Sequence, residues 1–152
     1  MPELRECRVA DFEQLWQLDQ SCFSPEIAYS RDELAYYLQL KTATCLVAYD
    51  ADHVRGFILG HRYRGDSGHI ITIDVDPTLQ RSGLGSTLIQ ALEEQFRSAG
   101  CKSILLEVAV NNHTALTFYK KHGYSVLKTL RRYYRGDLDA LLMGKAIRPQ
   151  DL

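Results

Sequence analysis

A glycine-containing segment that joins a strand-like run to a helical pattern is the part of this sequence best suited to bind a ligand. Residues 70–75 read as a strand, Asp76-Pro77 ends it, and residues 80–85 are Gln-Arg-Ser-Gly-Leu-Gly. Beyond them, apolar residues recur at helical spacing at Leu84, Leu88, Ile89, Leu92 and Phe96. Glycines at a helix N-terminus leave backbone N–H groups uncovered, and the helix dipole and Arg81 add positive charge. These properties predict a phosphate-binding site.

The glycine spacing separates this loop from other phosphate-binding loops. A dinucleotide fingerprint needs a third glycine where Leu88 stands, and a P-loop needs a lysine that the segment lacks. The segment resembles the [QR]-x-x-G-x-[GA] motif of the GNAT family of acetyl-CoA-dependent N-acetyltransferases. The resemblance implies that loop amides hold the pyrophosphate of acetyl-CoA; the alternative is a helix start whose glycines bind nothing. The implied cofactor-binding residues are Gln80, Arg81, Ser82, Gly83, Leu84, Gly85 and Ser86.

A second segment, residues 105–124, places a carboxylate inside an apolar strand. Glu107 interrupts the run 105–110, which is costly unless the carboxylate is paired, hydrated or faces a cleft. Asn112 is expected to cap the following helix and Gly123 to end it. The segment resembles the GNAT pattern L-x-V-x-x-x-N-x-x-A-x-x-[FL]-Y-x-x-x-G-[FY] at every defined position. Two motifs in this order identify the chain as a GNAT member, and the resemblance covers nearly its whole length.

Within that family the chain is similar to the RimI-type N-terminal acetyltransferases. The similarity rests on Leu106-Glu107-Val108 and on residues 131–143, where Tyr133 and Tyr134 would line the peptide entrance. A solvated aromatic loop is the alternative for these two tyrosines. Phe23 and Tyr29, in a proline-containing loop between two short helices, would form one wall of the acceptor groove, with core packing as the alternative.

The implied reaction assigns roles to Glu107 and Tyr119. A neutral amine must attack the thioester, and the departing thiolate must receive a proton. Tyr119 is expected to donate that proton, or else to pack on the cofactor as a core aromatic. Glu107 is expected to act as the base, or else only to orient the ammonium group. A free α-amine has a reference pKa of about 7.7–8.0, against about 10.4 for lysine, so a weaker base is enough to deprotonate it.

Other residues complete the expected site. Backbone groups of Ile73, Asp74 and Val75 are expected to position the thioester by β-addition. The Asp74 side chain would face the acceptor groove, where it favours a cationic substrate, or would contact solvent. Asn112 would contact the cofactor, with helix capping as the alternative. The histidines lack metal-ligand spacing and are expected at the surface or in caps, as for His69, His113 and His122.

The pattern of elements predicts an α/β (α+β) GNAT fold in one domain, residues 1–147, with a tail at 148–152. We expect a mixed, mostly antiparallel sheet of about seven strands, splayed at its centre, with helices on both faces. The expected strands are 4–9, 44–49, 54–60, 70–75, 103–110, 124–131 and 138–145. The expected helices follow Asp11, run from Ser30 to Leu40, and span 82–98 and 114–122.

The composition of the chain argues against several classes of binding partner. The net charge of -1 offers no basic field for nucleic acid, and four scattered cysteines predict neither a zinc site nor any other metal site. Without a membrane-length apolar run or a signal-like N-terminus, we expect a cytoplasmic protein. The acceptor would be a peptide or protein N-terminus; alternatives are a small amine, a polyamine, a protein lysine, or no acceptor in an idle domain that only binds coenzyme A. The chain would be a monomer or homodimer.

Overall fold

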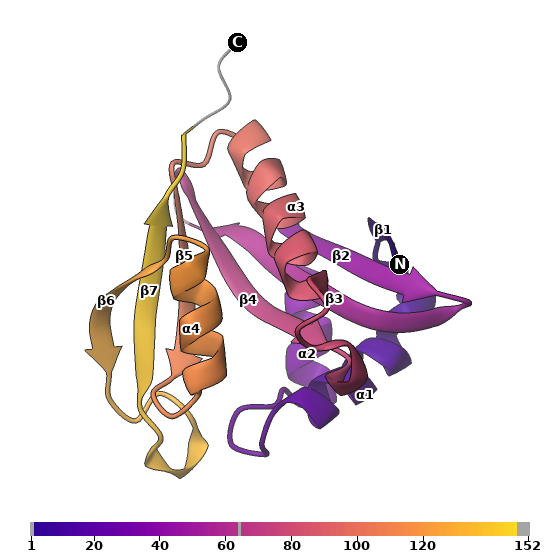
Figure 1. The fold of residues 1–152 in the computed structure, drawn as a ribbon, viewed down its shortest axis with the longest axis horizontal. Helices are drawn as coiled ribbons and strands as arrows, with labels where there is room; N and C mark the ends of the chain where they lie inside the picture. The colour runs from indigo at the N-terminus through magenta and orange to yellow at the C-terminus, as the bar shows by residue number, and fades with distance from the viewer. Residues whose placement is uncertain (1, 64, 149–152) are drawn as a thin grey trace.

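A computed structural model describes residues 2–63 and 65–148, which form one seven-stranded sheet with two helices on each face (Figure 1). The strands are β1 (Glu3–Glu6), β2 (Ala43–Asp50), β3 (His53–Tyr63), β4 (Ser67–Val75), β5 (Ser103–Ala109), β6 (Ser125–Leu130) and β7 (Ala140–Ala146). The helices are α1 (Phe12–Cys22), α2 (Arg31–Leu38), α3 (Leu84–Ser98) and α4 (His113–Lys121), with short 3-10 turns η1 (Val9–Asp11), η2 (Pro77–Leu79) and η3 (Arg135–Asp137).

The strand order is β1-β2-β3-β4-β5-β7-β6, and only β4 and β5 run parallel. Helices α3 and α4 cover one face of the sheet, and α1 and α2 cover the other (Figure 1). The mixed sheet with helices on both faces is therefore confirmed. No helix among the described residues is long and apolar enough to span a membrane.

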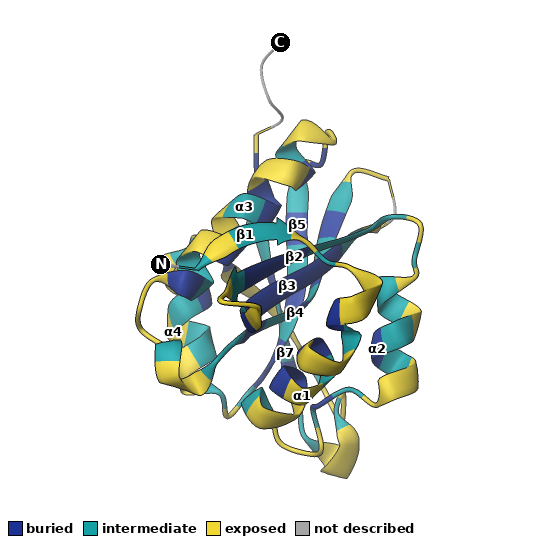
Figure 2. Ribbon diagram, turned by 90° about the vertical axis from the view of Figure 1, so that its right-hand side faces the viewer, coloured by how far each residue is buried: buried dark blue, intermediate teal, exposed yellow. Residues whose placement is uncertain are grey.

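Helix α3 packs closely on the sheet, and its predicted apolar stripe is confirmed. Leu84, Leu88, Ile89, Leu92 and Phe96 are all buried, and Figure 2 shows burial concentrated in the central strands. The close approach depends on glycines in the strands beneath the helix. A Cβ atom on Gly68 would lie 2.7 Å from the Phe96 ring, and one on Gly60 would lie 2.9 Å from it. These strand glycines let α3 lie against β3 and β4.

The sheet splits between its two parallel strands, as predicted. β4 pairs with β5 only from Ser67 to Ile70, opposite Ser103 to Leu106. Beyond that point β4 stays paired with β3 as far as Val75, and β5 with β7 as far as Ala109. A register shift between Leu59 and Gly60 leaves Ile71 as an extra residue in β4, a bulge that bends the strand. The facing edges of the two strands are thus left out of the ladder that joins them.

Several predicted boundaries differ. β1 ends at Glu6, because residues 9–11 form η1. Asp11 does not cap α1 with its side chain, because its carboxylate accepts from the Arg5 guanidinium at 2.7 and 2.9 Å and from the Arg8 N–H at 2.7 Å. Ser30 caps α2 as predicted, but that helix ends at Leu38. Of the predicted tail, residues 149–152 lie outside the described part of the chain.

Two buried carboxyl groups join α1 to β4. Asp19 is fully buried and Asp74 is only 1% exposed, so the predicted solvent contact of Asp74 is wrong. Asp19 Oδ2 accepts from the Tyr29 N–H at 2.8 Å, and Asp74 Oδ1 accepts from the Thr72 hydroxyl at 2.6 Å. The remaining oxygens, Asp19 Oδ1 and Asp74 Oδ2, find no donor among the described residues. Burial, followed by the negative charge of Asp19, raises the pKa of Asp74 well above its usual range, and one proton held between the two acids would partner both orphan oxygens.

This shared proton predicts that stability falls as pH rises. Above about pH 4 the unfolded chain loses a proton that the folded pair retains, so unfolding becomes easier by up to about 1.4 kcal/mol per pH unit. In Asp74→Asn the amide N–H donates to Asp19 at any pH, and we expect a flatter dependence and a higher free energy of unfolding at pH 8. Urea unfolding between pH 5 and 8 measures both.

Asp32→Asn, at an exposed position of α2, is the matched control and should keep the wild-type slope. A wild-type slope in Asp74→Asn would show that the pair does not hold a proton.

Candidate active site

The predicted phosphate-binding loop has the backbone geometry that anion binding needs. Gly83 is the N-cap of α3 in the left-handed region, at φ 91°, and contributes no capping side chain. The first helical N–H bonded within the helix belongs to Thr87, which donates to the Gly83 carbonyl at 3.0 Å. The preceding N–H groups therefore point out of the helix end. A Cβ atom at Gly83 would meet open space, so the loop leaves room for an anion at the helix end, and binding of the coenzyme A pyrophosphate there stays a prediction.

The rest of this loop is held by neighbouring elements. Arg81 also adopts a positive φ, 65°, and Gln80 Nε2 donates to the Val75 carbonyl at 3.5 Å. Ser86 Oγ lies 2.9 Å from Nε2 of His122, the C-cap residue of α4. A Cβ atom on Gly85 would lie 3.3 Å from the Phe118 ring. The loop is thus fixed between β4 and α4, and contact of its side chains with a cofactor stays a prediction.

Glu107 lies where the sheet splits. It is the first residue of β5 beyond the pairing with β4, and its side chain is 17% exposed. Its Oε1 is 2.7 Å from His69 Nε2, and His69 Nδ1 is in turn 3.1 Å from His61 Nε2. The expectation that His69 is a surface or capping residue is wrong. Nothing local in the sequence signals this pairing, because it depends on the register of β4 against β5.

The predicted entrance tyrosines lie beside Glu107. Burial, the Glu107 charge and a hydrogen bond to its carboxylate raise the pKa of Tyr133 to about 12. Burial, followed by Tyr133 and Glu107, raises the pKa of Tyr134 as well. The two rings stack edge to face at 4.9 Å between centroids. The segment that joins β6 to β7 therefore brings two phenols to the carboxylate, although Tyr133 remains half exposed.

Tyr119 reaches the same region from α4. The residue is 8% exposed and packs on Phe118 and Tyr124, with ring centroids 5.4 and 5.9 Å away. Burial raises the pKa of Tyr119, and the Tyr134 and Asp74 charges add to the effect. The phenol is therefore protonated at neutral pH. Tyr134 interacts electrostatically with both Tyr119 and Glu107, the two predicted catalytic groups.

The edge of β4 beyond the split has no neighbouring strand among the described residues, and side chains bond to two of its carbonyls. The Tyr29 hydroxyl donates to the Ile71 carbonyl at 3.3 Å, and Cys22 Sγ donates to the Val75 carbonyl at 3.3 Å. These carbonyls point away from β3, so by strand alternation Ile73 presents its N–H and C=O to the same edge. The Asp74 carbonyl instead lies on the β3 side, where a Cβ atom on Gly56 would be 2.9 Å from it.

Asp74 therefore leaves the predicted site. Its side chain points to Asp19 under α1 rather than into the acceptor groove, and its backbone faces β3. The physical reason is the bulge at Ile71, which changes the phase of β4. Ile70, Ile73 and Val75 all pack against the core between the sheet and α3. In a regular strand, even-numbered and odd-numbered residues face opposite sides of the sheet, so this alternation is broken between Ile70 and Ile73.

The remaining predicted residues take structural positions. Asn112 caps α4, its Oδ1 accepting from the Ala115 N–H at 3.1 Å, so the capping role is confirmed and a cofactor contact stays a prediction. The Tyr29 ring packs edge to face on the Tyr37 ring, with 5.5 Å between the ring centroids. Its hydroxyl donates to the Ile71 carbonyl at the edge of β4. Phe23 is the half-buried C-cap residue of α1.

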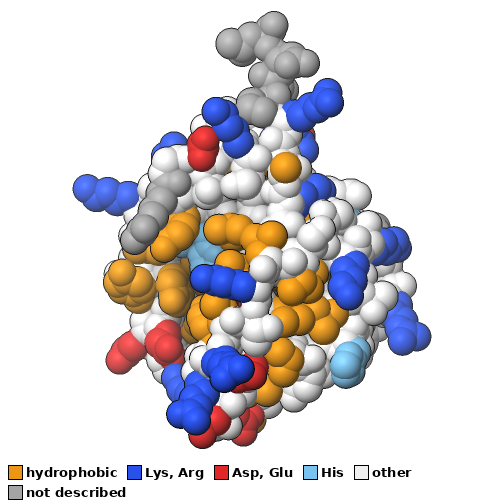
Figure 3. All heavy atoms as spheres, turned by 90° about the vertical axis from the view of Figure 1, so that its left-hand side faces the viewer, with side chains coloured by type: hydrophobic (Ala, Val, Ile, Leu, Met, Phe, Trp, Pro, Cys, Tyr) orange, Lys and Arg blue, Asp and Glu red, His pale blue; other side chains and the backbone are white. Residues whose placement is uncertain are grey.

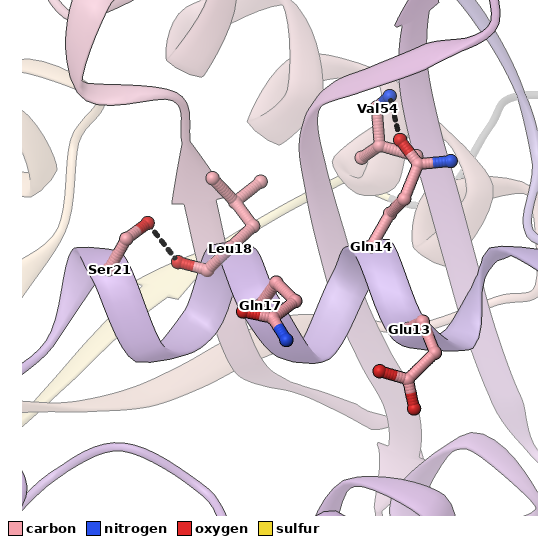
Figure 4. A pocket seen from close by; sticks show the side chains of 6 residues that line it. All are labelled: Glu13, Gln14, Gln17, Leu18, Ser21 and Val54. Atoms are coloured by element: carbon pink, nitrogen blue, oxygen red, sulfur yellow. Dashed lines mark hydrogen bonds between the residues drawn. The ribbon is translucent and has the colours of Figure 1, made fainter.

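Other hollows in the described surface are not lined by Glu107 or Tyr119. One of about 450 Å³ lies along α1, where Gln14 accepts from the Val54 N–H and Ser21 donates to the Leu18 carbonyl (Figure 4). Gln14 and Ser21 are therefore partnered within the chain. Among the described residues, no three His, Cys, Asp or Glu side chains are grouped to hold a metal ion.

Comparison with known proteins identifies the arrangement. Residues 12–124 match the acetyltransferase (GNAT) family. The chain is 28% identical to an N-alpha-acetyltransferase of Sulfurisphaera tokodaii, over 93% of this chain and 90% of that protein. It is 27% identical to the [ribosomal protein bS18]-alanine N-acetyltransferase of Salmonella typhimurium, over 90% of this chain and 92% of that protein. The structure of Ard1 from Thermoplasma volcanium superposes with a TM-score of 0.88 at 27% identity, covering 95% of this chain and 97% of that one. This chain, with its glycine loop at the start of α3 and its carboxylate at the split of the sheet, belongs to the GNAT family of N-acetyltransferases.

Proposed function

We propose that this protein transfers the acetyl group of acetyl-CoA to the N-terminal α-amine of a peptide or protein. The observation that carries the proposal is the place of Glu107, on the first residue of β5 after the strands part and beside Tyr133 and Tyr134. An anionic group among phenols suits a cationic amine that enters through the opening of the sheet. Relatives named N-alpha-acetyltransferase and bS18-alanine N-acetyltransferase support the same acceptor class.

Acetyl-CoA would bind along the split. The N–H groups at the start of α3 and Arg81 would hold its pyrophosphate, and the backbone edge of Ile73 and Val75 would hold the pantetheine arm. This directs the thioester toward the point where β4 and β5 part. Glu107 and Tyr119 then approach the reacting atoms from β5 and α4.

The proposed reaction balances with these two residues. The ammonium group gives one proton to Glu107, and the amine lone pair then attacks the thioester carbon. The C–S bond breaks as the amide forms. The departing sulfur takes the Tyr119 phenol proton, and Tyr119 regains a proton from the second N–H of the amine. The products are an N-acetyl chain, the coenzyme A thiol and one released proton.

The acceptor class follows from the strength of the base. A carboxylate is intrinsically a weak base, and a free α-amine has a pKa near 8 while lysine lies near 10.4. An α-amine is already partly deprotonated at cellular pH, so the base has to remove a proton from only part of the bound substrate. We therefore favour N-terminal acceptors over lysine and polyamines.

We expect release of coenzyme A thiol only with peptides that carry a free N-terminus. The panel compares peptides starting with Ala, Ser, Met or Gly with the same peptides blocked at the N-terminus but carrying lysine, and with polyamines. Turnover on lysine or polyamines alone would overturn the acceptor and keep the chemistry. Binding of acetyl-CoA without turnover on any acceptor would overturn the enzymatic function itself.

Removal of either proton-transfer group should lower kcat and leave acetyl-CoA binding unchanged. We expect Glu107→Gln and Tyr119→Phe each to reduce kcat about 100-fold, the size of one general acid–base contribution. Steady-state kinetics measures kcat, and calorimetry measures acetyl-CoA binding.

Glu94→Gln on α3 and Tyr36→Phe on α2 are matched exposed controls and should stay near wild type. If Glu107→Gln raised KM for the peptide without changing kcat, Glu107 would orient the ammonium group and another group would be the base.

A further inference from the structure

Two cysteines lie opposite each other where the pairing of β1 with β2 ends. β1 runs antiparallel to β2, and Glu6, its last residue, lies opposite Leu46. The Cys7 N–H donates to the Cys45 carbonyl at 3.0 Å, which continues this register by one residue pair. All four cysteines of the chain carry free thiols. Since directly opposite residues of an antiparallel pair project from the same face of the sheet, the thiols of Cys7 and Cys45 are neighbours.

The backbone spacing at this pair suits a disulfide. Residues joined by backbone hydrogen bonds across an antiparallel pair have Cα atoms about 5.5 Å apart. Disulfides join Cα atoms that are about 4.4–6.8 Å apart. Cys7 and Cys45 are both half-buried, and both pack against the core cluster that α1 and α2 cover. A bond between the two sulfur atoms therefore needs rotation of the side chains rather than movement of either strand.

A hollow beside the pair gives a small molecule access to both thiols. It has a volume of about 630 Å³ and is lined by both cysteines, by Phe12 at the start of α1, and by Ala35 and Leu38 of α2. The hollow also leaves space in which the cysteine side chains can turn. A reagent that enters it therefore meets two sulfur atoms from neighbouring strands.

The two thiols differ in reactivity. Interaction with the Cys45 thiol lowers the pKa of Cys7, against the opposing effect of burial. The same interaction, followed by burial, raises the pKa of Cys45. Because the thiolate is the attacking form of a cysteine, Cys7 is the first of the two to react.

We propose that Cys7 and Cys45 form a reversible disulfide when the folded protein meets a small disulfide of the glutathione class. The Cys7 thiolate attacks one sulfur of the small disulfide, and one thiolate leaves. The Cys45 thiol then loses its proton and attacks the Cys7 sulfur, and the second thiolate leaves. The small disulfide takes up two electrons and two protons and becomes two thiols, while the two cysteines are oxidised to one disulfide.

The bond would stabilise the part of the chain that carries the predicted acceptor wall. It closes residues 7–45 into a covalent loop that contains α1 and α2, together with Phe23 and Tyr29. Closing a loop restricts the unfolded chain more than the folded one, so oxidation raises the free energy of unfolding.

The candidate active site lies away from the cysteine pair. The cysteines face α1 and α2, while the glycine loop begins α3 on the opposite face of the sheet. β6 and β7 lie at the other end of the strand order from β1, on the side of the molecule where apolar side chains surround a histidine (Figure 3). We therefore expect oxidation to leave acetyl-CoA binding unchanged.

Oxidised glutathione, added to the folded protein, tests the proposal without any turnover. Trypsin cleaves after Lys and Arg, which places the cysteines in separate peptides, residues 6–8, 9–31, 42–55 and 98–102. Mass spectrometry under non-reducing conditions should find peptide 6–8 joined to peptide 42–55. We expect the midpoint of thermal unfolding to rise by about 5–10 °C on oxidation and to return when dithiothreitol is added.

Single substitutions give the controls. Cys7→Ser and Cys45→Ala should each lose both the cross-link and the rise in the unfolding midpoint. Cys22→Ser keeps a donor to the Val75 carbonyl and should behave as the wild type does. A bond from either peptide to Cys22 or Cys101 would overturn the proposal. So would a product in which Cys7 keeps the glutathione group while the Cys45 thiol stays reduced, or a cross-link that forms only in urea.

Discussion

The parallel pairing of β4 with β5 stops after four residue pairs, and the candidate site depends on that early stop. Past Ile70 and Leu106, each strand keeps only its other neighbour, so two rows of backbone groups lose their ladder partners. Buried backbone groups need partners, and Tyr29 and Cys22 supply them on the β4 side. His69 lies just before the last residue pair of β4 and β5, and Glu107 lies just after it. The imidazole and the carboxylate therefore meet where the two strands separate.

Helix α3 links the stability of the fold to the geometry of the loop. Its C-terminal half is pressed against Gly60 and Gly68 by the Phe96 ring, where no additional carbon fits. Its N-terminal end is open, and a Cβ atom at Gly83 would touch nothing. Dense packing at one end of the helix therefore fixes the direction of the uncovered N–H groups at the other. The anion site needs no side chain of its own, because the backbone of a well-anchored helix provides it.

Local patterns in the sequence predict most of the fold and part of the site. The stripe of α3, the α2 capping box and the Asn112 cap follow from the spacing of a few residues, and the structure confirms them. The placement of Asp74 could not be predicted, because the bulge at Ile71 changes which side of β4 each later residue faces. His69 was missed for a related reason. Its contact with Glu107 joins residues 38 positions apart and depends on strand register, which no local spacing reveals.

Two carboxyl groups near the split lie in different surroundings. Asp74 lies fully inside the protein against Asp19, where burial of a second negative charge is so costly that one proton stays bound. Glu107 keeps partial contact with solvent and faces an imidazole nitrogen instead of an acid. The fold therefore buries one carboxyl group under α1 and leaves the other at the opening of the sheet, in partial contact with solvent and beside a histidine.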